Sequence, residues 1–287
     1  MAIIETQNLS YVYSEGTPFR KVAIEDINIS IEEGDFIGII GHTGSGKSTL
    51  VQHLNGLLKP TSGTILFDGK DIHSSKEFTR SVRFNIGLCF QYPEYQLFES
   101  SVYKDIAFGP HNMGLSDEEI NEHVLRAADF VGIKKEMLKK SPFDLSGGEK
   151  RRVAIAGVIA MEPRVLILDE PTAGLDPKGR DTIADMIDNY RKSTGSTVIV
   201  VSHSMEDVAK SASKVLVMNK GHVEFFTGVK EVFSNVQRLV EIGLNVPQIT
   251  GILMDLKAKG YNVRTDIYSV DEAKSELFRF FKERGVL

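Results

Sequence analysis

The nine residues GHTGSGKST, at 41–49, are the feature that most restricts how this chain can fold. An apolar run, FIGII at 36–40, comes before them, and a stretch with helical spacing, LVQHLNGLL at 50–58, comes after them. Glycines let the backbone turn tightly and leave N–H groups free at a helix N-terminus, where the helix dipole attracts anions. The pattern therefore predicts a buried strand, a phosphate-binding loop and a helix, in that order.

The spacing also predicts a role for each polar side chain of the loop. We expect Lys47 to reach the β- and γ-phosphates of a nucleotide, Ser48 to place its hydroxyl on Mg²⁺, and Thr49 to add a phosphate contact. A glycine-rich turn without a ligand is the alternative, and the flanking strand and helix argue against it. The candidate binding residues of the loop are Gly41, His42, Thr43, Gly44, Ser45, Gly46, Lys47, Ser48 and Thr49.

Further apolar runs predict an α/β fold. VLIL at 165–168 and TVIVV at 197–201 are continuous rather than alternating, which is typical of parallel strands buried on both faces. INISI at 27–31 alternates apolar and polar residues, so residues 1–31 are expected to form an antiparallel sheet. The stretch 215–228 is expected to form a hairpin that turns at Asn219 to Gly221.

Two regions are expected to be mostly helical. Residues from about 92 to 162 contain a capping box at Ser116 and Glu119, followed by apolar residues at helical spacing. Residues 233–287 read as short helices, the last of which opens at a second box, Ser269 to Glu272. We therefore divide the chain into a main domain at 1–232 and a small C-terminal extension at 233–287.

Composition and charge exclude several classes of protein. No apolar run approaches the ~18 residues that a membrane-spanning helix needs. The start of the chain lacks the pattern of a secretory signal, and the single cysteine, Cys89, has no partner for an internal disulfide, so we expect a cytoplasmic protein. A net charge of −5 argues against a nucleic-acid partner.

A pair of carboxylates follows the apolar run at 165–168. Asp169 and Glu170 are expected at the carboxyl end of a buried strand, where ligands bind in open parallel sheets. We expect Asp169 to hold Mg²⁺ through water or through Ser48, and Glu170 to polarise the attacking water. Two carboxylates that merely end a strand are the alternative, which the need of a phosphate loop for a metal ligand disfavours.

The sequence LSGGE at 145–149 resembles the signature motif of the ATP-binding cassette (ABC) ATPases. Ser146, Gly147 and Gly148 present a hydroxyl and free N–H groups at a helix N-terminus, which makes a second anion site. The resemblance implies a P-loop NTPase fold, with a RecA-like core, an antiparallel β subdomain and a helical subdomain. It also implies that two chains close head to tail over two ATP molecules, each signature contacting the other chain's nucleotide.

Other positions match the ABC ATPases residue by residue. Gln91 matches the Q-loop glutamine, which senses Mg²⁺ and the γ-phosphate in that family, and His203 matches the switch histidine. The sequence AGLD matches the D-loop, which implies that Asp176 lies near the dimer seam. Tyr13 matches the aromatic residue that stacks on adenine, and Tyr11, two residues earlier, is the alternative.

Longer stretches are similar to one branch of this family, the energy-coupling factor ATPases. They are FQYPEYQLFESSVYKDIAFGP at 90–110, SPFDLSGGEKRRVAIAGVIAMEP at 141–163 and LDEPTAGLDPKGR at 168–180. SEGTPFRKVAIEDI at 14–27 is more similar to the second of the two paralogous ATPases of these systems. Such ATPases power bacterial uptake of vitamins or of cobalt or nickel ions.

This resemblance implies ATP and Mg²⁺ as ligands and a place on the cytoplasmic face of the cell membrane. It implies three kinds of partner: a second ABC ATPase subunit, a transmembrane T subunit, and a substrate-binding S component that is attached indirectly. A homodimer and a heterodimer both stay open, and so does the transported substrate. A soluble ABC ATPase that acts outside transport is the alternative.

Two apolar clusters have more than one interpretation. Tyr92, Pro93, Tyr95, Leu97 and Phe98 follow Gln91 and either line a groove for a helix of the T subunit or fill the core of the helical insert. In the C-terminal extension, a second cluster either forms a core within the chain or contacts a second subunit, and it consists of Leu277, Phe278, Phe280 and Phe281.

Overall fold

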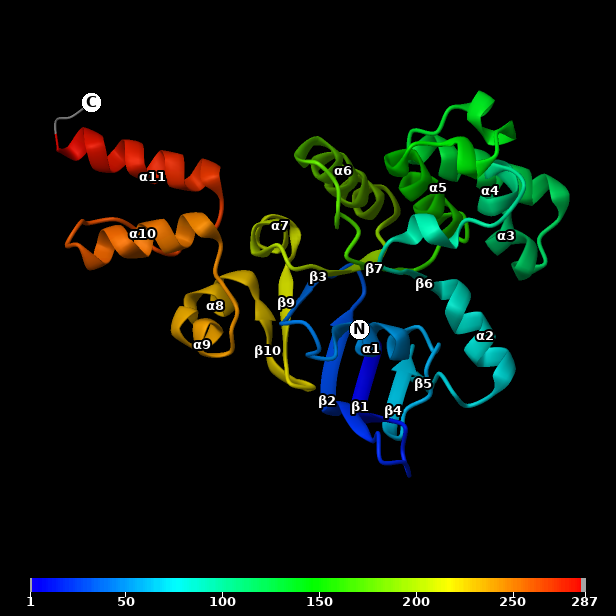
Figure 1. Cartoon of the computed structure of the whole chain (residues 1–287), viewed down its shortest axis with the longest axis horizontal. Coiled ribbons are helices and arrows are strands. Elements are labelled where there is room, and N and C mark those ends of the chain that lie inside the picture. The colour runs from blue at the N-terminus through cyan, green and yellow to red at the C-terminus, as the bar shows by residue number, and fades with distance from the viewer. Residues whose placement is uncertain (1, 285–287) are drawn as a thin grey trace.

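The computed structural model describes residues 2–284, so the outermost residues of the predicted segments, 1 and 285–287, lie outside the described residues. A six-stranded sheet lies at the centre of the molecule, with the strand order β10-β9-β3-β8-β7-β6 (Figure 1). Its strands are β3 (Phe36–Ile40), β6 (Ile86–Cys89), β7 (Val165–Asp169), β8 (Thr197–Val201), β9 (Lys214–Asn219) and β10 (His222–Gly228).

The apolar runs predicted as parallel strands are confirmed as β3, β7 and β8. Every residue of β3 and β7 is buried, as expected for strands covered on both faces. Val201 pairs with both Ile39 and Asp169, so the carboxyl ends of the three strands meet at one edge of the sheet. The predicted hairpin is also confirmed, because β9 and β10 pair antiparallel at Asn219 and His222.

A second sheet, with the order β2-β1-β4-β5, covers one face of the first. The antiparallel strands predicted at the start of the chain are confirmed, whereas β4 and β5 were not predicted. Isoleucines of the two sheets share one buried core with α1, and Leu50 and Leu54 of that helix are fully buried. The strands are β1 (Ala2–Tyr13), β2 (Lys21–Glu32), β4 (Ser62–Phe67) and β5 (Lys70–Asp71).

The helix after the phosphate loop, α1 (Lys47–Leu54), starts and ends earlier than the predicted 50–58. It begins directly after Gly46, which has a φ of 104°. It ends at Leu54 because the Asn55 side chain donates a hydrogen bond to the carbonyl of Ile86 and Gly56 has a φ of 72°. A further helix, α2 (Lys76–Asn85), was not predicted, and it is capped by Ser75.

Helices dominate the region between β6 and β7. The capping box at Ser116 and Glu119 is confirmed at the start of α4. Val102, Val124 and Val153, from three different helices, are fully buried in a shared core. The elements are η1 (Pro93–Gln96), α3 (Val102–Met113), α4 (Asp117–Phe130), η2 (Lys135–Lys139), η3 (Pro142–Asp144) and α5 (Gly147–Ile159). The subdomain limits at about 92 and 162 stay a prediction.

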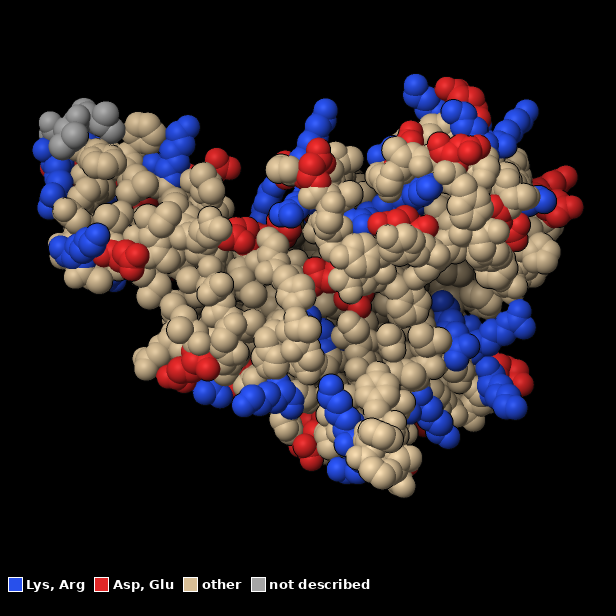
Figure 2. Space-filling model, in the orientation of Figure 1, with Lys and Arg blue, Asp and Glu red and all other residues tan. Residues whose placement is uncertain are grey.

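The remaining helices are α6 (Pro177–Thr194), α7 (Met205–Ser211), α8 (Val229–Ser234), α9 (Val236–Glu241), α10 (Gln248–Ala258) and α11 (Val270–Glu283). Phe233 of α8 and Leu239 of α9 pack into a core with β9 residues. The predicted domain boundary at residue 232 falls inside α8 and stays a prediction. Figure 2 shows a hollow between the C-terminal helices and α6, with basic and acidic side chains interspersed over this face.

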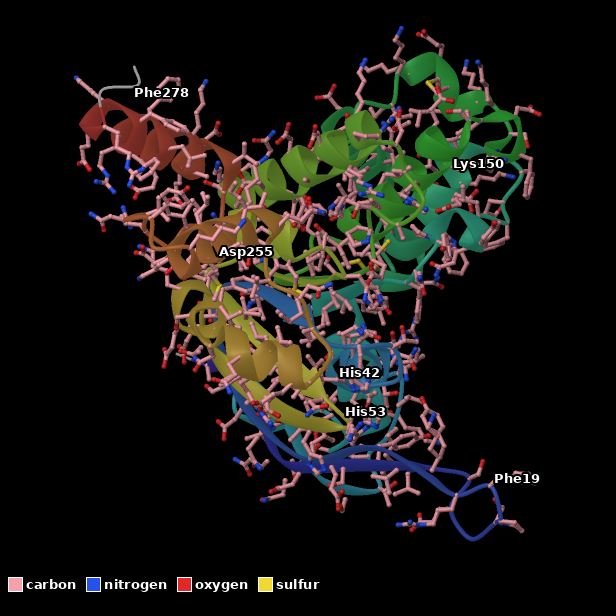
Figure 3. The ribbon with its side chains drawn as sticks, turned by 60° about the vertical axis from the view of Figure 1, so that its left-hand side comes forward. Phe19, His42, His53, Lys150, Asp255 and Phe278 are labelled. Carbon is pink, nitrogen blue, oxygen red and sulfur yellow. The ribbon has the colours of Figure 1, made fainter. Side chains whose placement is uncertain are left out.

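The C-terminal helices α10 and α11 form a small core of their own. Phe280 is buried there against Leu253 and Val263, and Leu277 packs at its edge. Phe278, in contrast, points outward and is 54% exposed (Figure 3). The two interpretations of the C-terminal cluster therefore divide among its members, since Phe280 fills a core within the chain and Phe278 stays free for another contact.

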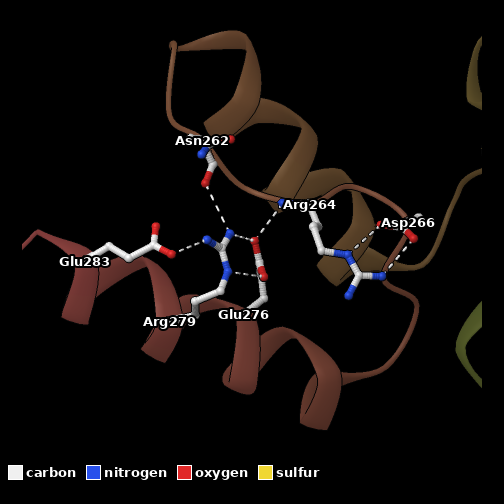
Figure 4. Close-up of polar contacts among 6 residues, drawn as sticks. All are labelled: Asn262, Arg264, Asp266, Glu276, Arg279 and Glu283. Carbon is white, nitrogen blue, oxygen red and sulfur yellow. Dashed lines mark hydrogen bonds and ion pairs between the residues drawn. The ribbon is translucent and has the colours of Figure 1, made fainter.

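A buried glutamate of α11 joins this helix to the loop before it by a hydrogen bond. Glu276 is buried, pairs with Arg279 at 2.5 Å and accepts a hydrogen bond from the backbone N–H of Arg264 at 2.8 Å (Figure 4). Ser269 caps α11 by accepting a hydrogen bond from the N–H of Glu272 at 3.3 Å. Over residues 2–284, no helix combines the length and the apolar character that crossing a bilayer requires.

Candidate active site

An open pocket of about 220 Å³ lies at the carboxyl edge of β3, β7 and β8. Residues from six separate stretches of the chain meet there, and most of them belong to the predicted site. They are Tyr13, Lys21, Ala23, Thr43, Gly44, Gly46, Lys47, Ser48, Thr49, Gln91, Asp169, Glu170 and His203. Lys21 and Ala23, on β2, were not predicted, because the sequence offers no signal that this strand reaches the loop.

The phosphate loop needs glycine at position 46. A Cβ atom there would lie 2.7 Å from the carbonyl oxygen of Ala23, and the φ of 104° is one that other residues rarely adopt. Gly41, His42 and Ser45 belong to the loop but do not line the pocket. The Ser45 side chain is fully buried inside the loop, so the neighbouring loop residues, and not this side chain, are placed to contact a ligand.

Lys47 is a buried cation at the floor of the pocket. Its Nζ atom donates hydrogen bonds to the carbonyl oxygens of Gly41, at 2.7 Å, and of His42, at 3.2 Å. Burial lowers the pKa of Lys47, while the charges of Glu170 and Asp169 act in the opposite direction. The ammonium group is therefore held by the loop itself, at the position where phosphate oxygens would approach.

The side chains of Ser48 and Asp169 meet in the pocket. Burial raises the pKa of Asp169, and the Ser48 hydroxyl and the charge of Lys47 oppose this rise. A hydroxyl and a carboxylate are hard oxygen donors, which suit Mg²⁺. The residues present thus fit the predicted metal, although two protein oxygens complete an octahedral shell only with phosphate and water.

Glu170 has the most unusual environment in the pocket. It is 8% exposed, and its backbone adopts a left-handed φ of 53°. Burial, followed by the neighbouring charge of Asp169, raises the pKa of Glu170 to about 7. Its Oε1 atom is buried and has no hydrogen-bond partner within residues 2–284. A carboxylate with a free acceptor and a pKa near neutrality is suited to general-base chemistry.

The predicted switch histidine and Q-loop glutamine border the same pocket. The Nε2 atom of His203 lies 3.3 Å from Oε1 of Glu170, although the two are not aligned as a hydrogen bond. Burial lowers the pKa of His203, so the imidazole is neutral at pH 7. Gln91 follows β6 and is exposed on the pocket wall.

The two candidate tyrosines occupy different environments. Tyr13 lines the pocket, is 39% exposed, and its hydroxyl lies 3.3 Å from Oγ1 of Thr49. Tyr11 does not line the pocket and packs its ring edge-on against Tyr13 and against the buried His53. This placement favours Tyr13 as the residue that stacks on a base, with Tyr11 behind it.

The signature residues lie apart from the pocket. Ser146, Gly147 and Gly148 start α5 and do not line it, and a Cβ added to either glycine would meet nothing within 4 Å. Figure 3 shows the neighbouring Lys150 on the helical part of the molecule, away from His42. Asp176 caps α6 by accepting a hydrogen bond from Gly179 N–H at 2.9 Å, and it also lies outside the pocket.

Comparison with known proteins identifies the family to which this site belongs. The family described as ABC transporter matches residues 24–173. The energy-coupling factor transporter ATP-binding protein EcfA2 of Clostridium tetani is 55% identical over 283 residues, which cover 98% of each chain. The chain belongs to the energy-coupling factor transporter ATP-binding proteins.

Other energy-coupling factor ATP-binding proteins are similarly close. EcfA2 of Caldanaerobacter subterraneus subsp. tengcongensis is 53% identical over 279 residues, covering 97% of this chain and 98% of the relative. The solved structure of cbiO1 from Clostridium perfringens, part of the ABC transporter complex cbiONQ, is 43% identical, with a TM-score of 0.74 over 88% of this chain and 99% of that chain. The predicted α/β ABC fold is thereby confirmed.

A more distant structure adds information on nucleotide binding. A dimer of the ATP-binding cassette MJ0796, bound to ADP and Pi, is 26% identical, with a TM-score of 0.71 over 79% of this chain and 98% of that chain. Members of the ABC family bind and hydrolyse ATP, and the energy-coupling factor ATP-binding proteins are named for the first of these properties.

Proposed function

We propose that this chain binds ATP with Mg²⁺ and hydrolyses ATP to ADP and phosphate as a subunit of an energy-coupling factor transporter. The hydrolysis powers bacterial uptake of vitamins or of cobalt or nickel ions through a separate transmembrane subunit. The observation that carries the proposal is the pocket itself, in which the buried lysine of the phosphate loop meets two adjacent carboxylates, a glutamine and a histidine from three other chain segments. The names of the relatives support the transport role.

In this proposal, each side chain of the pocket has one task. Lys47 binds the β- and γ-phosphates, and Tyr13 stacks on adenine. Glu170 takes up a proton from the attacking water, which its free Oε1 atom can accept when the carboxylate is ionised. His203 and Gln91 orient the γ-phosphate and the water. Ser48, Asp169 and Gln91 would hold Mg²⁺, which neutralises charge on the phosphates when it is bound.

A second ATPase subunit is required for a complete site. Gly147 and Gly148 start α5 outside the pocket with open space around them, as expected if they contact the nucleotide of a second subunit. The prediction that Ser146 offers a free hydroxyl and a free N–H is wrong for this structure, because both donate to Oε2 of Glu149, at 2.7 and 2.9 Å, and would have to leave it to contact that nucleotide. Asp176, at the start of α6, would lie at the seam between the two subunits. A paralogous ATPase and a second copy of this chain both fit these half-sites.

The transmembrane T subunit is proposed to bind beside the loop that follows Gln91. Pro93 and Leu97 are buried there, while Tyr95 is 84% and Phe98 is 59% exposed. The cluster is therefore partly core and partly surface. Phe98 and Phe108 line an open groove between η1, α3, α5 and β6, and helix-in-groove docking is a common mode of recognition. Docking there would place the chain on the cytoplasmic face of the membrane, with the S component attached through the T subunit.

The groove is tested by copurification from membranes that contain the native partners. Tyr95→Ala and Phe98→Ala should each weaken recovery of a small transmembrane subunit, while ATP binding stays intact. Phe19→Ala is the matched control, since Phe19 is an equally exposed aromatic residue at the far tip of the β1–β2 turn (Figure 3). Recovery that is unchanged in the groove variants would refute this docking surface.

A further inference from the structure

Arg151 of α5 is a buried cation that the proposed chemistry does not use. Its side chain is 3% exposed, although the neighbouring Arg152 is only half-buried. It lies two residues after the LSGGE motif. A buried guanidinium is costly unless all its hydrogen-bond donors are paired, so the identity of its partners indicates what it does.

The first partner of Arg151 is Glu94, in the loop that follows Gln91. Nε donates to Oε2 of Glu94 at 3.0 Å, and Nη2 donates to Oε1 at 2.6 Å, so the ion pair is bidentate. Partial burial alone would raise the pKa of Glu94, but the hydrogen bonds and charge of Arg151 hold it below its usual value. Glu94 is therefore a carboxylate anchored to α5.

The other partners of Arg151 belong to the turn that carries the proposed base. Nη1 donates to the carbonyl oxygen of Ala173 at 2.6 Å and to that of Pro171 at 3.2 Å. The N–H of Ala173 donates in turn to the carbonyl of Glu170 at 3.2 Å. Since Glu170 itself has a left-handed backbone, this turn needs outside support to keep its shape.

Arg151 thus joins two loops that are far apart in the sequence. One holds Glu94, 57 residues from Arg151, and the other holds Pro171 and Ala173, 20 and 22 residues from it. One loop begins at Gln91 and leads to Leu97 and Phe98, which line the groove proposed for the transmembrane subunit. The other begins at Glu170. Two loops that bind one guanidinium group are coupled. A shift of one loop moves the guanidinium group and breaks its hydrogen bonds to the other loop.

We propose that Arg151 is a positioning residue that couples the loop after Gln91 to the turn of Glu170, so that displacement of Glu94 changes the placement of the base. Movement at the groove then alters the rate of ATP hydrolysis through Glu94 and Arg151, without a direct contact between the docked partner and the pocket. This inference rests on the proposed function, since it takes Glu170 as the base.

The test compares ATP hydrolysis by the full-length protein, with the subunits that copurify, in Arg151→Lys and Glu94→Gln variants. Lysine keeps the charge but cannot hold a carboxylate and two carbonyls at once. We expect kcat to fall by about 10- to 100-fold in Arg151→Lys, as for other supporting residues of an active site, with a smaller fall in Glu94→Gln. The KM for ATP should change by less than about threefold in both.

A second readout separates positioning from mere loss of structure. If the turn loosens when its partner loop is altered, hydrogen exchange at residues 170–175 should rise in Glu94→Gln, although the substitution lies in the other loop.

Two controls make the outcomes distinguishable. Arg126→Gln removes an exposed Arg–Glu pair of similar length, 2.7 Å to Glu162, and should leave kcat and the hydrogen exchange of residues 170–175 unchanged. Glu170→Gln tests the base: if it hydrolyses ATP normally, the proposed function fails first. If Glu170→Gln is inactive but both test variants keep the wild-type kcat and hydrogen exchange, only the coupling inference is overturned. A fall in kcat with unchanged hydrogen exchange at residues 170–175 also overturns it.

Discussion

The Nε2 atom of His203 lies 3.3 Å from Oε1 of Glu170, where the loops that follow β8 and β7 meet. Oε1 is buried and makes no hydrogen bond within residues 2–284, so it is an acceptor without a donor. Such an atom is costly in a folded protein and is retained where a ligand or water supplies the donor. The pair thus marks the point at which an attacking water would be held.

The pH dependence of hydrolysis follows from the ionisation of Glu170. A general base acts only when it is ionised, and burial raises the pKa of Glu170 to about 7. We therefore expect kcat/KM for ATP to rise with pH and to reach half of its maximum near pH 7. An acid limb near pH 4.5, the ordinary value for glutamate, would contradict this environment for Glu170.

Replacing Glu170 by glutamine should remove the base without removing the nucleotide. Hydrolysis is expected to fall by roughly 10²- to 10⁴-fold, the usual range for loss of a general base. ATP binding should persist, because the phosphate contacts come from the loop, and closed dimers should accumulate. Equilibrium binding of ATP, single-turnover hydrolysis and size-exclusion chromatography together check this, and normal turnover would refute the role of Glu170.

The same substitution should also change stability in a pH-dependent way. The folded-state pKa of Glu170 is raised, so the native state binds more protons than the unfolded state between about pH 4.5 and 7. The buried carboxylate of Glu170 therefore destabilises the wild-type protein more and more as the pH rises through this window, and the effect is complete above it. In thermal unfolding without nucleotide, the Tm of Glu170→Gln should exceed the Tm of the wild type at pH 8 and match it near pH 4.5. Equal stability at pH 8 would argue against a strained carboxylate.

Lys47→Ala should abolish tight ATP binding. A charge-assisted hydrogen bond to phosphate contributes about 1.5–3 kcal/mol, or roughly 10- to 100-fold in affinity, and Lys47 would make more than one. The measurement is calorimetric titration with ATP and Mg²⁺. Lys59→Ala, an exposed lysine just beyond α1, is the control and should bind normally. Retention of wild-type affinity in Lys47→Ala would refute the phosphate-binding role of this loop.

The choice between Tyr13 and Tyr11 can be made by paired substitutions. Tyr13→Ala should weaken ATP binding by about 1–3 kcal/mol if its ring stacks on adenine, and Tyr13→Phe should restore most of the affinity. Tyr11→Ala should have a smaller effect, since Tyr11 packs behind Tyr13. The opposite order of the two alanine variants would assign the base contact to Tyr11.

The sequence predicted the parts of the site that adjacent residues define. Lys47 and Ser48 follow a glycine loop, and Asp169 and Glu170 end an apolar run, so local order along the chain was sufficient to place them. Their meeting at one edge follows from the parallel order of β3, β7 and β8, which the continuous apolar runs indicated.

The parts that the sequence did not predict depend on contacts between distant residues. Lys21 reaches the pocket only because β2 lies over the loop, and no pattern around it differs from an ordinary exposed lysine. The ion pair of Arg151 and Glu94 spans 57 residues, and neither residue has a partner at helical spacing. The short strand β5 has two residues, too few for an alternating pattern to be recognised.

The most direct test of the transport proposal is to tag this chain in its native cell, solubilise the membranes gently and identify by mass spectrometry what copurifies. We expect a small transmembrane subunit together with substrate-binding components, which would identify the transported substrate. Recovery of a paralogous ATPase would indicate a heterodimer, and its absence would indicate a homodimer. Recovery only in the soluble fraction, with ribosomes or assembly factors, would contradict the transport role and leave the ATPase chemistry in place.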